Sequence, residues 1–482
     1  MHVSKTKMDF LYQLMYRMLT IITPLITSPY LSRVLGVSNM GIYSATYAVV
    51  NYFTLIAMLG VEMYGSRCIA SCKNDRDVWH TFSDIYIVQL MSSMISFIVY
   101  YLTVFIYGGD RFNYLLAQGI WIIAMMLDIN WVFFGLQEFK VTSLRNFFVK
   151  LLTILLIFVF VKSEDDLLKY ILIMTLCAVI NQVIMWGILL KKIKFTKPRI
   201  KYFRIHLKSM VRLFVPVAAM SIYHIMDKTM VDLLSDEING GCYYSADRLV
   251  NIPLGMVTAI GTVMLPKMTK LICERNSNYK NMLVKSGELT ICMIAAIAFG
   301  LGAISSCFVP VFFGPGYELC VLLIKIFIPV LIIKALGEFI RQQYLIPNSR
   351  DGLYIIAVCC GAVINLVANF IMISRWGAIG AVLGTLVAET TVLIIEMVWT
   401  KKEIDYKSII LNNSIYLIFG MVMYLVINYI DKKIVIAGIP KLIVLITIGI
   451  FIYTISCCVY CNYNSNSIFH IYLNKKRKSK YE

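Results

Sequence analysis

Apolar runs of about twenty residues follow one another along almost the whole sequence, and such runs leave few folds open. Hydrophobic residues make up 59% of the 482 residues and charged residues only 15%. A helix of about twenty apolar residues crosses the hydrocarbon core of a bilayer, whereas the alternating ten-residue segments of a membrane β-barrel are absent from this sequence. We therefore predict an all-α integral membrane protein.

The apolar runs predict about fourteen transmembrane helices. The expected spans lie at residues 10–32, 41–63, 82–107, 114–136, 146–162, 168–190, 208–233, 241–264, 287–312, 318–340, 352–374, 378–400, 412–430 and 438–461.

Lysine and arginine predict the orientation. They concentrate in alternate connections, including the basic stretch 191–207 and the C-terminal KKRKSK, and cytoplasmic connections carry such an excess. Both termini are therefore expected on the cytoplasmic side, with the tail at the membrane surface. The net charge of +18 is explained by this face, which meets anionic lipid, so nucleic acid is not an expected partner.

A weak similarity between two segments of the sequence predicts two related halves. YSATYAVVN at 43–51 resembles YSADRLVN at 244–251, and each opens an even-numbered span. Duplicated six-helix halves are common in transporters. We expect the regions 1–190 (N-lobe), 191–207 (basic cytoplasmic connector), 208–400 (C-lobe), 401–461 (two further spans) and 462–482 (basic cytoplasmic tail).

Charged residues inside the apolar runs are the candidate site, because an ionised group in the hydrocarbon region costs several kcal/mol unless it faces protein or water. Arg17, Lys228 and Arg248 lie on helices that begin or open the two halves. A cationic cluster in a low-dielectric cavity suits a diphosphate or another anion.

Three charged residues of the tenth expected span share one helix face. Lys334, Glu338 and Arg341 recur at i, i+4 and i+7. This face either lines a polar route, or Glu338 simply pairs with Lys334 or Arg341 near the cytoplasmic interface, where long side chains reach water.

Cofactor and metal sites are not expected. The cysteines are scattered through apolar runs, the one C-x-x-C at 458–461 has no partner pair, and the histidines show no ligand spacing. The nucleotide-binding sequence G-x-x-x-x-G-K-[ST] is also absent, so ATP hydrolysis by this chain is not expected.

Four stretches of the sequence are similar to a known family. They are PLITSPYLSRVLGVSNMGIYSATYAVVNYF at 24–53, LDINWVFFGLQEFKVTSLRNFFVK at 127–150, MDKTMVDLLSDEINGGCYYSADRLVNIPLGMVTAIGTVMLPKM at 226–268, and IKALGEFIRQQYLIPNSRDG at 333–352. These stretches resemble the polysaccharide repeat-unit flippases (Wzx type) of the multidrug/oligosaccharidyl-lipid/polysaccharide (MOP) exporter superfamily. They occur in the family's order across the expected spans one to twelve, so the resemblance covers most of the chain.

The resemblance implies a MATE-like fold of two six-helix lobes plus two C-terminal helices around a cavity that opens alternately to either side. It implies that an undecaprenyl-diphosphate-linked oligosaccharide is moved across a bacterial cytoplasmic membrane for O-antigen, capsule or exopolysaccharide synthesis, beside a polymerase and chain-length machinery. Arg17, Lys228 and Arg248 fit the cations that hold the diphosphate, with Lys334 and Arg341 where the cargo enters.

Coupling to an ion gradient is one expected source of energy, and consumption of the cargo outside is the other. Asp128, Asp227 and Glu389 are the candidate ion-binding residues, because they are acidic and lie within spans.

Three other functions remain open from the residues. A multidrug extruder of the same superfamily is expected to use a dominant acidic site, and a lipid II flippase differs only in cargo. A membrane-embedded polymerase or glycosyltransferase needs a large outer loop or a soluble domain, and the expected outer connections are short. Asp232, Asp236 and Glu237 form a catalytic cluster in that last interpretation and a solvated acidic turn in the others.

Overall fold

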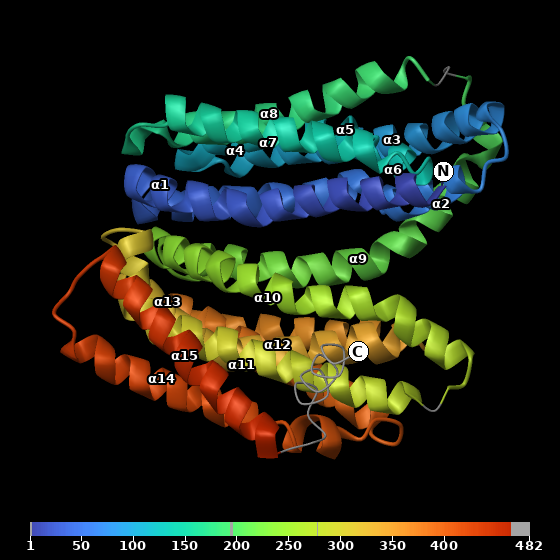
Figure 1. Cartoon of the computed structure of the whole chain (residues 1–482). Coiled ribbons are helices and arrows are strands. Elements are labelled where there is room, and N and C mark those ends of the chain that lie inside the picture. Colours follow the sequence, from blue (N-terminus) through green and yellow to red (C-terminus); the bar gives the residue numbers. More distant parts are fainter. Residues whose placement is uncertain (1, 193–195, 277, 464–482) are drawn as a thin grey trace. The chain divides into compact units, whose positions relative to one another are not determined.

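Every regular element that the structure describes is a helix (Figure 1), which confirms the predicted fold class. The structure is a computed structural model that describes residues 2–192, 196–276 and 278–463, with side chains at all of these except 2–21, 216, 219, 220, 223, 224, 256 and 461–463. The chain forms two compact units, residues 1–232 and 233–482. Each unit is described by itself.

The first unit runs from α1 to α9. Its elements are α1 (His2–Met58), α2 (Val61–Ala70), α3 (Asp75–Tyr107), η1 (Gly109–Arg111), α4 (Phe112–Gln118), α5 (Ile120–Met126), α6 (Asn130–Gly135), α7 (Phe139–Phe160), η2 (Glu164–Asp166), α8 (Leu167–Leu189) and α9 (Ile200–Leu234), whose last two residues lie past the division.

The second unit runs from α10 to α15. Its elements are α10 (Glu237–Cys273), α11 (Asn278–Phe312), α12 (Glu318–Ile340), the π-helix η3 (Arg341–Leu345), α13 (Asp351–Thr400), the π-helix η4 (Lys407–Leu411), α14 (Ile415–Lys433) and α15 (Ile439–Tyr463).

Two glycines divide the two longest helices. Gly36 in α1 has φ 76° and ψ 173°, and Gly377 in α13 has φ 52° and ψ −129°. An L-residue with a side chain rarely adopts a positive φ, so glycine is the residue that permits these breaks. Each break falls between two expected spans, and each of the two helices is far longer than one bilayer crossing requires.

Eleven helical segments within the described residues are long and apolar enough to cross a membrane. Two of them contain Gly36 and Gly377. The segment with Gly377 covers two expected spans, and the segment with Gly36 covers the span 41–63 and part of the span 10–32. The seventh expected span, 208–233, falls within α9, which is not among the eleven. The total of fourteen spans stays a prediction.

The expected span 114–136 is a broken helix. It is divided into α4, α5 and α6, with Gly119 at the first break and residues 127–129 at the second. A break in the backbone frees polar groups that hydrocarbon cannot satisfy, so it survives only where the protein supplies partners. At the second break the amide of Asn130 donates to the Asp128 carboxylate at 2.8 Å.

The division between the units falls two residues before the end of α9, one helix later than the expected end of the N-lobe at residue 190. The reason is visible in the contacts of α9. His206 contacts Tyr64 on α2 and Thr229 contacts Tyr52 on α1. The lobe boundaries inferred from the similarity of the two segments stay a prediction, because they rest on the repeat and not on compactness.

The last two expected spans pack into the second unit. α14 lies against α11 and α15, and Tyr416, Met423 and Leu445 belong to the same buried cluster as Ile291 and Phe339 of α11 and α12.

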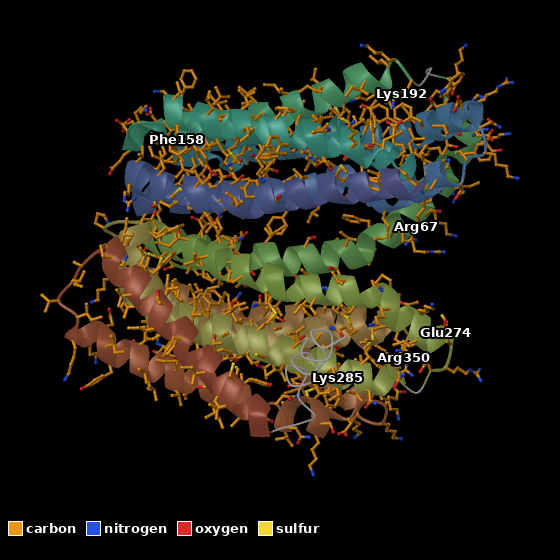
Figure 2. The ribbon with its side chains drawn as sticks, viewed as in Figure 1. Arg67, Phe158, Lys192, Glu274, Lys285 and Arg350 are labelled. Atoms are coloured by element: carbon orange, nitrogen blue, oxygen red, sulfur yellow. The ribbon has the colours of Figure 1, made fainter. Side chains whose placement is uncertain are left out.

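The outer faces of the helices are apolar, as a lipid environment requires. Phe105 in the first unit and Phe370 and Phe451 in the second are each more than 60% exposed. Figure 2 shows Arg67 and Lys192 at one end of the first unit and Phe158 at the other. Both basic residues come from expected cytoplasmic connections, so their common location agrees with the predicted alternation.

We predict that Gly377→Ala destabilises the protein by about 1–3 kcal/mol, because a positive φ strains any side chain. The added Cβ would also meet the Oδ1 atom of Asn239 at 2.6 Å. Thermal unfolding in detergent measures the change. Gly352→Ala is the matched control on the same helix, since nothing lies within 4 Å of its added Cβ. Equal unfolding temperatures for the two variants would contradict the prediction.

Candidate functional site

The expected cationic residues are divided between the two units. Lys228 is half-buried on α9 in the first unit, next to Asp227, whereas Arg248, Lys334 and Arg341 belong to the second unit. The side chain of Arg17 lies outside the described residues, although its backbone is part of α1. Their role as one anion site therefore stays a prediction.

Arg248 lies half-buried on α10. Its Nη1 donates to the hydroxyl of Tyr244 at 3.4 Å, and its guanidinium carbon lies 5.9 Å from the centre of that ring. A tyrosine one turn away thus contacts the guanidinium through both its hydroxyl and its ring. A positively charged group held in this way can meet an anion.

Arg341 is engaged within the protein. Its guanidinium forms an ion pair with Glu338, donates to the hydroxyl of Tyr354 at 2.5 Å and lies 4.8 Å from the centre of the Tyr354 ring. Gln342 also donates to Glu338, at 3.0 Å. The structure therefore supports the second interpretation of this helix face, in which Glu338 pairs with Arg341.

Lys334 lies half-buried one turn before Glu338 on α12. The structure gives Lys334 no hydrogen bond or ion pair with another described residue. Lys334 is therefore better placed than Arg341 to offer its charge to a ligand.

The first unit contains a buried polar network around the second break of the expected span 114–136. The Asp128 carboxylate accepts from the Asn130 side chain and from Gln182, both at 3.1 Å. Arg145 on α7 donates to Asn130 at 2.9 Å and to Asn146 at 2.6 Å. Asp128 and Arg145 are 9% and 5% exposed. The network therefore holds opposite charges, bridged by an amide, in the interior of the unit.

The same break is supported from α3 and α8. Gln89 donates to the carbonyls of Met125 and Asp128 at 3.0 and 2.8 Å, and its own carbonyl accepts from the buried Trp131 indole at 3.0 Å. Trp186 donates to the Leu127 carbonyl at 2.9 Å. These bonds satisfy the carbonyls that the broken helix leaves open.

The other two candidate ion-binding residues lie apart in sequence and in different units. Asp227 is buried on α9, within electrostatic reach of Tyr52. Glu389 is half-buried on the second half of α13. The assignment of these residues and of Asp128 to ion coupling stays a prediction.

The acidic turn between α9 and α10 has structural roles. Asp232 forms an ion pair with Arg111 of η1, with its two oxygens 2.6 and 2.7 Å from Nη1. Asp236 caps α10 by accepting from the Asn239 amide at 2.7 Å. These contacts support the interpretation as a turn, and the part of the chain that the structure describes shows no group of three or more His, Cys, Asp or Glu able to hold a metal.

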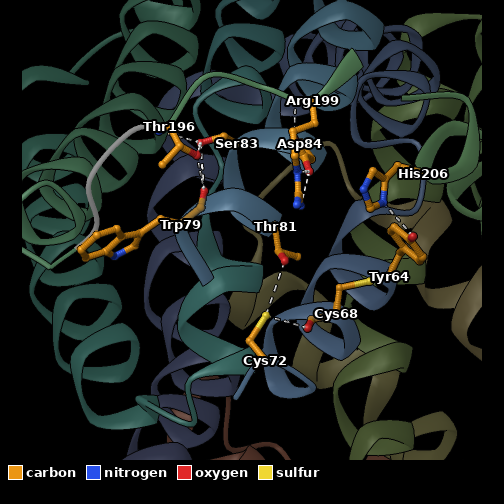
Figure 3. Close-up of polar contacts among 10 residues, drawn as sticks. All are labelled: Tyr64, Cys68, Cys72, Trp79, Thr81, Ser83, Asp84, Thr196, Arg199 and His206. Atoms are coloured by element: carbon orange, nitrogen blue, oxygen red, sulfur yellow. Dashed lines mark hydrogen bonds and ion pairs between the residues drawn. The ribbon is translucent and has the colours of Figure 1, made fainter. Parts of the chain in front are cut away.

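The basic connector is docked onto the start of α3 (Figure 3). The carboxylate of Asp84, a fully buried side chain, accepts from the Arg199 amide at 2.6 Å and from its Nε at 2.8 Å. Thr196 donates its amide to Ser83 at 3.2 Å. A carboxylate with both oxygens occupied by a backbone and a guanidinium donor fixes the direction in which the chain enters α9.

His206 continues this contact on the first turns of α9. Its Nδ1 and the Tyr64 hydroxyl are 2.8 Å apart (Figure 3). Burial lowers the pKa of His206 below its ordinary value, so the imidazole stays neutral at pH 7.

An apolar cavity of about 480 Å³ lies in the second unit between α11, α14 and α15. Gly300, Met423, Leu445, Gly449 and Ile450 are among its lining residues. Because the lining is almost wholly apolar, the cavity suits hydrocarbon and not a sugar or a phosphate.

A match to a protein-family model shows which family the chain belongs to. The model of the polysaccharide biosynthesis protein family matches residues 7–272, more than half of the chain. The chain belongs to this family. The resemblance seen in the four sequence stretches is thereby confirmed.

Two relatives extend the match beyond the family model. The chain is 23% identical over 378 residues to a protein of Shigella dysenteriae named "Putative O-antigen transporter", covering 77% of this chain and 94% of the relative. An Escherichia coli (strain K12) protein of the same name is 22% identical over 391 residues, with 79% and 93% covered.

Solved structures show that this family member has the fold of the MOP superfamily. The lipid II flippase MurJ in an inward closed conformation is similar with a TM-score of 0.71 at 15% identity, over 94% of this chain and 99% of that one. An inward-facing multidrug resistance MATE family transporter is similar with a TM-score of 0.56 at 15% identity, over 80% and 98%.

The sequence does not predict the roles of two buried charged residues, Arg145 and Glu396. Arg145 falls between the expected spans 114–136 and 146–162 but lies in the Asp128 network. Glu396 falls within the expected span 378–400 and is buried. A lone arginine at the edge of an apolar run gives no signal of burial. Glu396 did have one, because it follows Glu389 by seven residues on the same helix face.

We predict energetic coupling between Asp128 and Arg145. Asp128→Asn and Arg145→Gln should each destabilise the protein, because each leaves a buried charge without its counter-charge. The double variant should lose less than the sum of the two, with an interaction energy of roughly 0.5–3 kcal/mol. Unfolding of the four proteins in detergent gives this energy directly. Additive losses would show that the two charges are independent.

Proposed function

We propose that the protein is a flippase that moves undecaprenyl-diphosphate-linked oligosaccharide from the inner to the outer leaflet of the bacterial cytoplasmic membrane. The family membership carries this proposal, together with relatives named O-antigen transporters that the chain matches over nearly their whole length. The MOP fold, which a lipid II flippase and a MATE transporter share, supports it.

The physical task explains why the protein needs charges within its membrane region. A sugar diphosphate loses its hydration in hydrocarbon at a prohibitive cost, whereas a polar cleft lined with cations replaces much of that hydration. The prenyl tail can remain in lipid throughout. Such a protein supplies a route and breaks no covalent bond, which agrees with relatives that are named transporters.

Arg248 and Lys228 carry the diphosphate-binding proposal, with Lys334 where the cargo enters from the cytoplasmic side and Arg17 as a further cation. Arg248 lies half-buried on α10 beside Tyr244, and Lys334 lies half-buried on α12. Arg341 is the weakest of the five, because Glu338 already neutralises it.

The apolar cavity between α11, α14 and α15 suits part of a prenyl chain. Its volume of about 480 Å³ and its apolar lining match a branched hydrocarbon and exclude the polar part of the cargo. Polymerase and chain-length proteins are proposed as functional partners, because they consume the cargo that the flippase delivers.

Transport in proteoliposomes tests the cationic residues. A lipid-diphosphate-linked oligosaccharide should cross with the wild-type protein, and Arg248→Ala and Lys228→Ala should each reduce the rate at least tenfold, as expected when one charge-assisted contact of about 1.5–3 kcal/mol is lost. Lys285→Ala is the control, because Lys285 is an exposed residue of α11. Equal rates in all four proteins would keep the flippase and remove this site.

Filling the apolar cavity tests the prenyl-chain proposal. Gly300→Phe places a ring in the cavity, where an added Cβ meets only the methyl group of Met423, at 3.5 Å. Transport of a long-chain prenyl cargo should fall, and that of a short-chain analogue should change little. Gly187→Phe on the exposed side of α8 is the matched control, since an added Cβ there would meet no described group within 4 Å. Equal losses for both cargo lengths would contradict a role in holding the chain.

Transport of drug-like cations by the same proteoliposomes distinguishes the multidrug interpretation, and transport of lipid II distinguishes the peptidoglycan one. The proposal expects neither at rates comparable with the oligosaccharide cargo.

A further inference from the structure

The carboxyl group of Glu396, near the end of α13, is buried and has no hydrogen-bond partner. Glu396 is only 2% exposed, and neither carboxylate oxygen has a partner among the residues that the structure describes. An ionised carboxylate in such a place costs several kcal/mol unless a neighbouring charge balances it. The alternative is that the group holds a proton.

The carboxyl group of Glu396 lies beside a glycine of the neighbouring helix. The Oε2 atom lies 3.5 Å from the position that a Cβ at Gly337 of α12 would occupy. Glu338 and Arg341 follow directly on α12 and η3, and both exert an electrostatic influence on Glu396. Glu389 does so from the same helix as Glu396.

The other described groups within electrostatic reach of Glu396 supply no second positive charge. Tyr354 of α13 and Tyr406, which precedes η4, are neutral phenols within electrostatic reach of Glu396. Lys334 has no ion pair with Glu396 in the described structure. Arg341 is therefore the cation of this cluster, and it already pairs with Glu338.

The charges of the cluster thus do not balance when all of its groups are ionised. One guanidinium faces the carboxylates of Glu338 and Glu396, with that of Glu389 further along the helix. Two more polar atoms beside them, Nε of Arg341 and Oε1 of Gln342, are buried without partners among the described residues. For the three groups Arg341, Glu338 and Glu396, one added proton removes the excess negative charge.

We propose that Glu396 is a proton-binding residue of the second unit, and that its proton decides whether the Arg341 guanidinium is shared between two carboxylates or kept by Glu338. With the proton bound, Glu396 is neutral and Arg341 stays with Glu338 and Tyr354. When the proton leaves, Glu396 becomes a second counter-charge for Arg341. The use of this proton in transport rests on the proposed function, whereas the proton site itself does not.

A proton fits this site better than a metal cation does. Hard cations such as Mg²⁺ and Ca²⁺ take six or more oxygen ligands, and they favour sites with several oxygens converging on one point. Here one oxygen of Glu338 already accepts from both Arg341 and Gln342. The described residues contain no cluster of three or more acidic or other metal-binding side chains at this position.

Infrared difference spectroscopy on the purified protein tests the proposal without cargo. A protonated carboxylic acid absorbs at a higher frequency than the amide groups or a carboxylate, so it can be followed as pH is varied. The wild-type protein should show at neutral pH a protonated-carboxyl band that is missing from Glu396→Gln. Identical spectra for the two proteins across the titration would overturn the proposal.

Two further variants make the test specific. Glu338→Gln leaves Glu396 as the nearest carboxylate to Arg341, so the Glu396 band should disappear at lower pH than in the wild type; an unchanged band would show that the two groups do not compete. Glu403→Gln is the control. Arg350 donates to Glu403 at 2.6 and 2.8 Å and lowers the pKa of that carboxyl, so it is ionised at neutral pH and its removal should leave the band unchanged.

Addition of sodium at constant pH distinguishes the bound species. The band should not respond to sodium, and a loss of the band on sodium addition would replace the proton by a metal cation and overturn the proposal. Oligosaccharide transport is then measured as a function of pH, and it should lose its pH dependence in Glu396→Gln.

The two proposals fail separately. The expected band with no transport of the cargo would keep the proton site and remove the proposed function. Transport of the cargo with identical infrared spectra would do the reverse.

Discussion

Hydrocarbon offers no hydrogen bonds, and the rest of this structure follows from that lack. The backbone satisfies itself by coiling, which is why the described elements are helices. The helices break at glycines or where side chains bond the freed backbone groups. Gly36 and Gly377 permit breaks of the first kind through their positive φ angles. At the break beside Asp128, the Asp128 carboxylate accepts from the Asn130 amide and Gln89 donates to the Asp128 carbonyl.

Charges within the two units are handled in different ways. In the first unit, Asp128 and Arg145 are joined through asparagine and glutamine side chains, so the charge is spread over a network of amides. In the second unit, Glu338 forms an ion pair with Arg341, and the Glu396 carboxyl group has no hydrogen-bond partner among the described residues. The Asp128 carboxylate has three hydrogen-bond donors, whereas the Glu396 carboxylate has none among the described residues, so Glu396 is the group whose charge a proton most readily removes.

The fold was largely predictable because it depends on run length and on the distribution of lysine and arginine, both of which are readable without tertiary contacts. The partners of single charges were not. The sequence placed Arg341 at i+3 from Glu338 but left open whether it pairs or meets cargo, because helix periodicity defines a face and not the neighbour of that face. The break at Asp128 was missed for a related reason: its partners Gln89 and Gln182 lie on other helices.

The contact between Asp84 and Arg199 shows that the basic connector is not the boundary between the two compact units. The longest and most basic connection in the chain looks like a linker, yet its second half is fastened to α3 and leads into a helix that belongs to the first unit. The chain passes from one unit to the other after Asp232, two residues before α9 ends. In this protein, composition alone therefore marks the wrong segment as the boundary between compact units.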